Sequence, residues 1–196
     1  LNTGGMGTFS PSKQYTPKVQ EQVEREIIFP TLDALNAEGR PFKGVIFFGL
    51  MLTQKGPKLL EYNARFGDPE AQSVLFRMKN DLLEIFEAVI DERLQEIQLE
   101  FEEGAAVCVV MASGGYPEHY EKGKEITGLE DVSPEVMVFH AGTKLENGKF
   151  YTSGGRVLGV VAKGEDIQAA RKIAYENVEK IHFEGAQYRK DIGIKK

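Results

Sequence analysis

Three polar side chains suited to a metal–phosphate site stand at alternate positions of one expected strand. Glu61, Asn63 and Arg65 fall within residues 60–70, which read LEYNARFGDPE. Alternate side chains of a strand share a face and are about 6.6 Å apart, so two of them can reach one ion. Carboxylate and amide oxygens suit Mg²⁺, and a guanidinium suits phosphate or carboxylate. The row therefore predicts a site for a metal-bound nucleotide phosphate.

The same alternation is also typical of a strand that simply faces solvent, and the pattern alone does not separate the two interpretations. The residues just after the row favour a site, because Gly67-Asp68-Pro69 is a tight turn leading into a helix-start signal. Asp68 is expected to cap that helix, whose first amides form a further anion site. The Asp68 carboxylate would compete with an anion for those amides.

A glycine-rich loop opens the chain at Gly4, Gly5, Met6 and Gly7. Backbone N–H groups in such a loop can approach an anion without side-chain obstruction. The loop is neither a P-loop nor a dinucleotide-binding fingerprint, and taken alone it favours a loose terminus. Because the chain starts without an initiator Met, we expect it to be a fragment of a longer protein.

Composition limits the classes of function. The 196 residues carry a formal net charge of −6, so they offer no basic field, and we expect no nucleic-acid partner. A single cysteine excludes an internal disulfide framework and a multi-cysteine zinc site. No apolar run approaches the roughly 20 residues of a membrane-spanning helix. We predict no membrane association and a cytoplasmic location.

The first half reads as helices around a hairpin. Thr16-Pro17 starts a helix that Pro30 is expected to kink or end, and a short helix over about 31–37 follows. Residues 44–53 predict a strand buried on both faces, and residues 58–66 predict its hairpin partner. Two further helices follow Pro69 and Asp81. The acidic run at residues 99–103 suggests a domain boundary near residue 100.

The second half reads as a small α+β unit. A buried strand is expected at residues 105–111, and further strands are expected at residues 136–140 and 156–162, followed by an amphipathic helix beginning near Ile167. Cys108 lies inside an apolar run, which predicts a buried structural thiol rather than a nucleophile. The histidines are scattered without metal-ligand spacing, and His140 is expected to be structural.

Several motifs, taken in order, resemble the phosphoribosylamine–glycine ligase family of the ATP-grasp superfamily. They are residues 2–7 (NTGGMG), 60–70 (LEYNARFGDPE), 116–117 (YP), 120–123 (YEKG), 139–143 (FHAGT), 153–160 (SGGRVLGV) and 188–193 (YRKDIG). The likeness runs from residue 2 to residue 193. It implies an α+β fold, with the C-terminal part of an ATP-grasp domain of antiparallel strands and helices at residues 1–100 and a small α+β C-terminal domain at residues 101–196.

The resemblance also implies a reaction and its residues. Enzymes of this family join glycine to 5-phosphoribosylamine in purine synthesis, using ATP with Mg²⁺ or Mn²⁺, through an acyl phosphate. Carried over by motif, Glu61 and Asn63 are the metal ligands, and Arg65 lies near the transferring phosphoryl group as the catalytic residue. The substrate and phosphate side is lined by Asn2, Thr3, Gly4, Gly5, Met6, Gly7 and Asp68. Lys122, Ser153 and Arg156 are candidates for the mouth of the cleft.

The likeness covers only the C-terminal half of such an enzyme. Its N-terminal half, which clamps adenine and triphosphate, is then the expected partner, and we expect no useful catalysis from this chain alone. Two alternatives stay open. The first alternative is another ATP-grasp carboxylate–amine ligase, because Glu-x-Asn is shared across the superfamily. The second alternative is a folded module without catalytic activity.

Overall fold

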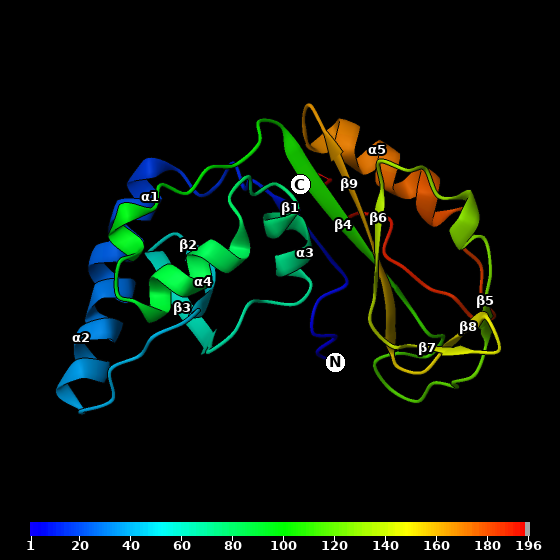
Figure 1. The fold of residues 1–196 in the computed structure, drawn as a ribbon, viewed down its shortest axis with the longest axis horizontal. Helices are drawn as coiled ribbons and strands as arrows, with labels where there is room; N and C mark the ends of the chain where they lie inside the picture. Colours follow the sequence, from blue (N-terminus) through cyan, green and yellow to red (C-terminus); the bar gives the residue numbers. More distant parts are fainter. Residues whose placement is uncertain (195–196) are drawn as a thin grey trace. The chain divides into compact units, whose positions relative to one another are not determined.

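Residues 1–194 are described by a computed structural model, in which the chain divides into two units (Figure 1). The hairpin unit contains Ser12–Gly67 and Lys79–Glu100. The sheet unit contains Leu1–Pro11, Asp68–Met78 and the residues from Phe101 onward. One junction lies at residue 100, where a domain boundary was expected, but two earlier segments belong with the second half. The two-domain division at residue 100 stays a prediction.

Two antiparallel sheets form the framework of the sheet unit. The larger has the strand order β1-β4-β9-β6, and the smaller has the order β5-β8-β7. Helices accompany them, one of which is the 3₁₀ turn η3. The elements are β1 (Gly7–Ser10), α3 (Glu70–Leu75), β4 (Ala105–Ala112), β5 (Glu125–Ile126), η3 (Leu129–Asp131), β6 (Met137–His140), β7 (Thr143–Glu146), β8 (Lys149–Thr152), β9 (Arg156–Gly164) and α5 (Ile167–Val178).

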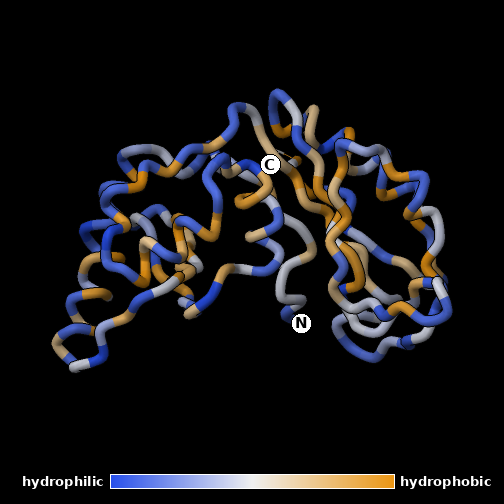
Figure 2. Tube along the Cα trace, in the orientation of Figure 1, coloured by the Kyte–Doolittle hydropathy of each residue, from blue (hydrophilic) through white to orange (hydrophobic). Residues whose placement is uncertain are grey.

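The core of the sheet unit is built on both faces of strand β4, all of whose residues are buried. Its odd-numbered residues, beginning with Val107, belong to the large apolar cluster that includes Ala170 and Ala174 of α5. Ala106, Cys108 and Val110, together with Val161 of β9, form a second cluster that contacts Phe76, just after α3. Figure 2 shows β4 and β9 as predominantly hydrophobic. The prediction of a fully buried strand here is confirmed.

Helices and one hairpin make up the hairpin unit. Its elements are α1 (Pro17–Val23), the π-helical segment η1 (Glu24–Ile28), α2 (Phe29–Ala37), β2 (Phe47–Thr53), β3 (Gly56–Asn63), α4 (Leu82–Ile90) and the 3₁₀ turn η2 (Leu94–Glu96). Thr16 caps α1, because its hydroxyl accepts a hydrogen bond from the Val19 amide at 3.4 Å. The helical run does not end at Pro30, which lies in the first turn of α2. The preceding π-helical turn rearranges the bonds that a proline cannot complete.

Strand β2 departs from the sequence expectation. It pairs with β3 in a two-stranded antiparallel sheet, and none of its residues is buried: Met51 is 51% and Leu52 is 39% exposed. The predicted burial on both faces is therefore wrong for the described chain, because two strands alone give each other little cover. No helix among residues 1–194 is both long enough and apolar enough to span a membrane.

Candidate functional site

The predicted row of site residues begins at an irregularity in β3. Gly49 pairs with Glu61 and Leu50 pairs with Leu59, so Leu60 is an extra residue, a β-bulge. Because Gly49 and Leu50 are neighbours, their partners Glu61 and Leu59 point to opposite faces of the hairpin. A regular strand would have placed Glu61 and Leu59 on the same face. The bulge therefore decides where the Glu61 carboxylate points.

The two faces have different surroundings. Leu59 and Tyr62 line a cavity of about 530 Å³ together with residues of η1 and α2 such as Ile27 and Leu35. The pairs Gly49–Glu61 and Phe47–Asn63 put Glu61 and Asn63 together on the opposite face. Glu61 is exposed and Asn63 is half-buried. The predicted pair of hard oxygen donors thus shares one face, away from the helix-lined cavity.

Arg65 does not belong to the same strand. Strand β3 ends at Asn63, three residues before the predicted end at residue 66, so the alternating row stops there. The exposed Arg65 side chain nevertheless bends back: Nη2 donates to Asn63 Oδ1 at 3.4 Å, and Nη1 donates to the Phe66 carbonyl at 2.8 Å. Side-chain contact, rather than strand alternation, brings the guanidinium to the amide.

The donor chemistry of this row fits a divalent cation. Glu61 and Asn63 each offer an oxygen of the type that Mg²⁺ and Mn²⁺ prefer, and phosphate and water oxygens normally complete the octahedron. Beside Glu61 there is space that a single Cβ at Gly49 would fill, 3.1 Å from Glu61 Cγ. No group of three or more His, Cys, Asp or Glu side chains suitable for a metal ion occurs within residues 1–194.

The glycine-rich loop is held in place within the sheet unit. Gly7 starts β1, whose pairing with β4 joins Gly7 to Val109. Before it, the Gly4 amide donates to Asn2 Oδ1 at 2.9 Å and the Gly5 amide donates to Thr3 Oγ1 at 3.3 Å. These two amides therefore already have acceptors. These contacts hold the loop in place, whereas the glycines alone favoured a loose terminus.

Arg156, at the start of β9, joins this loop to the Asp68 turn. Its Nη1 donates to the carbonyls of Gly4 (2.9 Å), Gly5 (3.3 Å) and Asp68 (2.8 Å), and its Nη2 pairs with Asp68 Oδ2 at 2.9 Å. The Arg156 side chain is 21% exposed. Gly5 approaches the Asp68 turn so closely that a Cβ there would lie 2.7 Å from Pro69 Cδ. One guanidinium thus fixes two of the segments predicted to bind substrate.

The expected role of Asp68 as a helix cap is wrong. Helix α3 begins at Glu70 with Pro69 in the capping position, and no side chain of the described residues caps it. The Asp68 carboxylate instead accepts from Gln72 Nε2 at 2.9 Å and from Arg156. A cation and an amide therefore bind a carboxylate that the sequence pattern assigned to backbone N–H groups.

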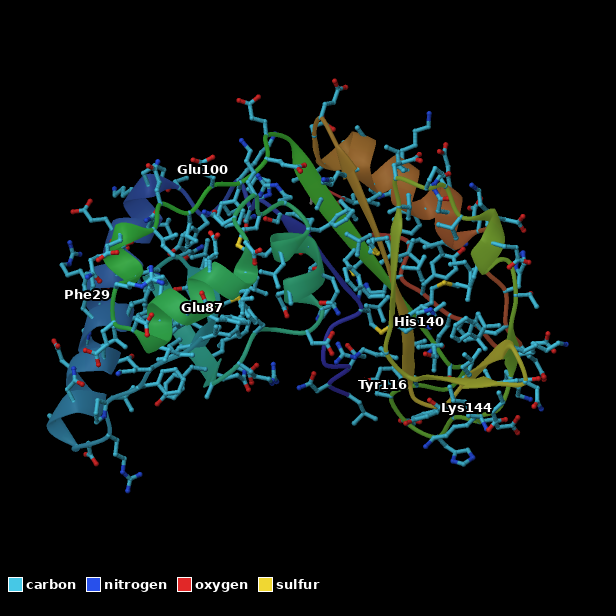
Figure 3. All side chains as sticks on the ribbon, viewed as in Figure 1. Phe29, Glu87, Glu100, Tyr116, His140 and Lys144 are labelled. Atoms are coloured by element: carbon cyan, nitrogen blue, oxygen red, sulfur yellow. The ribbon has the colours of Figure 1, made fainter. Side chains whose placement is uncertain are left out.

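Further residues, to which the motifs assigned no role, contact the glycine-rich loop or line the cavity beside it. Tyr116, labelled in Figure 3 on the loop after β4, donates its hydroxyl to the Thr3 carbonyl at 2.6 Å. Thr3, Gly7 and Tyr116 line a cavity of about 710 Å³ that is also lined by Arg189 and Ile192. The segments 116–117 and 188–193 carried the family resemblance, so this signal was available, but nothing in the sequence indicated that they meet.

Cys108 is buried in the sheet, as predicted. Burial, reinforced by the charges of Asp68 and Glu70, raises the pKa of its thiol to about 12. Such a thiol stays protonated at neutral pH and is a poor nucleophile. His140 ends β6, where its ring lies 4.5 Å from that of Phe150 and Nδ1 lies 3.0 Å from Thr143 Oγ1.

Two family models match the chain, and their ranges contain the residues of this region. The model described as phosphoribosylglycinamide synthetase, ATP-grasp (A) domain, matches residues 1–71, and the model of the C domain of the same synthetase matches residues 106–195. The chain belongs to the phosphoribosylglycinamide synthetase family. The family resemblance seen in the motifs is confirmed, as is the α+β fold with antiparallel sheets.

Curated relatives of this synthetase family carry the name phosphoribosylamine–glycine ligase. The protein from Caldanaerobacter subterraneus subsp. tengcongensis is 53% identical over 191 residues, which cover 97% of this chain and 46% of the relative. The protein from Clostridium acetobutylicum is 50% identical, covering 100% of this chain and 46% of the relative. The chain thus spans a little under half the length of these relatives.

Solved structures agree with this family assignment. The crystal structure of phosphoribosylamine–glycine ligase from Thermotoga maritima matches with a TM-score of 0.80 at 40% identity, covering 98% of this chain and 47% of that one. The biotin carboxylase domain of a thermophilic 2-oxoglutarate carboxylase matches with a TM-score of 0.66 at 15% identity, covering 93% of this chain and 41% of that one. At that identity the second match shows a common fold alone.

Proposed function

We propose that this chain supplies the metal- and phosphate-binding part of a ligase that joins glycine to 5-phosphoribosylamine with hydrolysis of ATP. The observation that carries the proposal is that Glu61 and Asn63 lie on the same face of the hairpin, in a chain of the phosphoribosylglycinamide synthetase family. A metal ion bound there would neutralise charge on ATP phosphate oxygens while the carboxyl group of glycine becomes an acyl phosphate.

The three residues of the row have distinct roles in this proposal. Glu61 and Asn63 contribute a charged and a neutral oxygen to Mg²⁺ or Mn²⁺. Arg65 holds its guanidinium next to Asn63, from which it can donate to a phosphoryl oxygen as negative charge develops there. The Phe66 carbonyl accepts from Arg65 Nη1 and restricts the rotation of this long side chain.

The substrate-binding part of the proposal lies in the sheet unit. We assign it to Asn2, Thr3, Gly4, Gly5, Met6, Gly7 and Asp68, with Arg156 as the residue that fixes their arrangement. Support comes from the four Arg156 contacts and from the cavity of about 710 Å³ beside Thr3 and Gly7. That volume is within the range of small-molecule sites.

Metal binding is the first test. We expect the unaltered chain to bind Mn²⁺. Binding is measured by the loss of the electron paramagnetic resonance signal of the free ion. Glu61→Gln and Asn63→Ala should each weaken it by about tenfold or more. Glu87→Gln, which removes an exposed carboxylate from α4, is the matched control (Figure 3). Equal Mn²⁺ affinity in the unaltered chain and Glu61→Gln would remove the basis of the proposal.

Turnover is the second test. The relatives are about twice as long as this chain, and we propose that the clamp for adenine and triphosphate lies in the part of the family that the chain does not match. We therefore expect no ADP release above background from the chain with ATP, glycine and 5-phosphoribosylamine. Turnover at the rate of an ordinary ligase would show that the proposed location of the nucleotide clamp outside this chain is wrong.

A further inference from the structure

Gly49 interrupts the apolar strand β2 directly opposite Glu61. Its φ angle is not in the left-handed region, so the backbone there does not require glycine. A glycine in the interior of a strand weakens the strand and often marks a place of close approach. Some other requirement must therefore favour the absence of a side chain at this position.

A side chain at Gly49 would take up space beside Glu61. A Cβ built at Gly49 would lie 3.1 Å from Glu61 Cγ and 3.4 Å from the Glu61 carbonyl oxygen. The first distance is shorter than an ordinary carbon–carbon contact, which is about 3.5–4.0 Å. The flexible Glu61 side chain would then have to move by a few tenths of an ångström. Gly49 is the neighbour that leaves Glu61 in its present position.

The bulge and the glycine act on the same carboxylate. The bulge at Leu60 puts Leu59 on the face opposite to that of Glu61 and Asn63, and Gly49 leaves the face of these two donors open beside Glu61. Without the bulge, Glu61 would point to the face of Leu59. Without the glycine, it would meet a side chain across the strand pair. Together they give one carboxylate a defined direction on a short hairpin.

We propose that Gly49 is a positioning residue for the Glu61 metal ligand, an inference that rests on the function proposed above. Mg²⁺ requires nearly ideal octahedral geometry with short metal–oxygen distances, and Mn²⁺ is nearer to it in size than Ca²⁺, which accepts longer and less regular distances. A displaced Glu61 carboxylate therefore weakens the binding of the smaller ions more than that of Ca²⁺. This selectivity separates positioning from a general role in folding.

The test compares Gly49→Ala and Gly49→Val with the unaltered chain. Since a misplacement of 1 Å can cost about a hundredfold, we expect Mn²⁺ binding to weaken by about fivefold in Gly49→Ala and by about thirtyfold in Gly49→Val. Ca²⁺, measured by competition with Mn²⁺, should weaken by about twofold or less. Melting temperatures should not fall in Gly49→Ala, because alanine restricts the unfolded chain more than glycine does.

Gly159→Ala is the matched control. Gly159 also lies inside a strand, β9, and a Cβ there would meet Cys108 Sγ at 3.4 Å, an ordinary contact. The Mn²⁺ affinity of Gly159→Ala should equal that of the unaltered chain. A crystal structure of Gly49→Ala gives a second measurement that does not depend on metal, and Glu61 Cγ should be displaced in it.

The outcomes separate this inference from the proposed function. If Glu61→Gln abolishes Mn²⁺ binding but Gly49→Ala binds Mn²⁺ normally or leaves Glu61 unmoved, Gly49 does not position the ligand and the metal site stands. Equal losses of Mn²⁺ and Ca²⁺ affinity in Gly49→Ala would also overturn the positioning role. If the unaltered chain does not bind Mn²⁺, both proposals are overturned together.

Discussion

Arg156 is the side chain whose removal should have the most specific effect on the glycine-rich loop. Its guanidinium makes three bonds to backbone carbonyls, those of Gly4, Gly5 and Asp68, and one to the Asp68 carboxylate. Replacing Arg156 with alanine removes all four. Replacing Asp68 with asparagine removes only the charge of one acceptor. Comparing the two variants therefore separates the backbone contacts from the ion pair.

The exposure of the two partners sets the expected magnitudes. The Asp68 side chain is 54% exposed, so solvent screens the ion pair, which should contribute about 0.5 kcal/mol. Hydrogen bonds from a charged donor contribute more, about 1.5 kcal/mol or above when they are protected from water. Since the Arg156 side chain is only 21% exposed, we expect Arg156→Ala to cost about 2–3 kcal/mol and Asp68→Asn about 0.5 kcal/mol.

Urea unfolding gives these free energies, and hydrogen exchange shows where protection is lost. In Arg156→Ala the amides of residues 2–7 should exchange faster, while those of β4, buried in the core, should change little relative to global stability. Arg25→Ala is the control, because the Arg25 side chain is 64% exposed and its loss should cost less than about 0.5 kcal/mol. Equal destabilisation by Arg156→Ala and Asp68→Asn would refute the carbonyl contacts as the main contribution.

Two more residues, Tyr116 and Cys108, give predictions that each depend on a single local environment. Tyr116→Phe removes the hydrogen bond to the Thr3 carbonyl and should cost about 1 kcal/mol in urea unfolding, with faster exchange near residues 3–5; unchanged exchange would contradict it. Cys108 should resist thiol reagents at about pH 8 until the chain unfolds. The reason is that burial raises the pKa of its thiol to about 12, against about 8.5 in an unfolded chain. Rapid labelling of the folded chain would contradict this prediction. Because the unfolded thiol loses its proton first, the stability difference between the unaltered chain and Cys108→Ala should be fully present below about pH 8.5 and shrink as the pH rises toward 12.

Local sequence patterns determined the elements of the fold that depend on near neighbours. The apolar run at residues 105–111 predicted a buried strand, and β4 is buried along its whole length. Thr16-Pro17 predicted the start of α1. The row at Glu61 and Asn63 predicted two donors on one face, which is where the register of β2 and β3 puts them. In each case the propensity or spacing of a few consecutive residues was enough.

The route by which Glu61 and Asn63 reach that face was not predictable from β3 alone. The strand pattern placed Glu61, Asn63 and Arg65 in one row, but the strand ends before Arg65, and the bulge at Leu60 puts Leu59 on the face opposite to Glu61. A bulge depends on how two strands pair, because the partner strand decides which residue is left over. Gly49 was visible in the sequence, yet its partner across the hairpin was not.

Long-range contacts were decided only by the tertiary structure. Arg156 bonds to Gly4 across 152 positions of the sequence, and β1 pairs with β4 rather than with the residues next to it in the chain. Because of such pairings, the first residues belong with the second half of the chain. Local propensity cannot specify a partner a hundred residues away, since the free energy of that contact depends on the whole packed core. The sequence determined which side chains we propose for metal and phosphate binding, and the packing of distant segments determined the contacts that hold them.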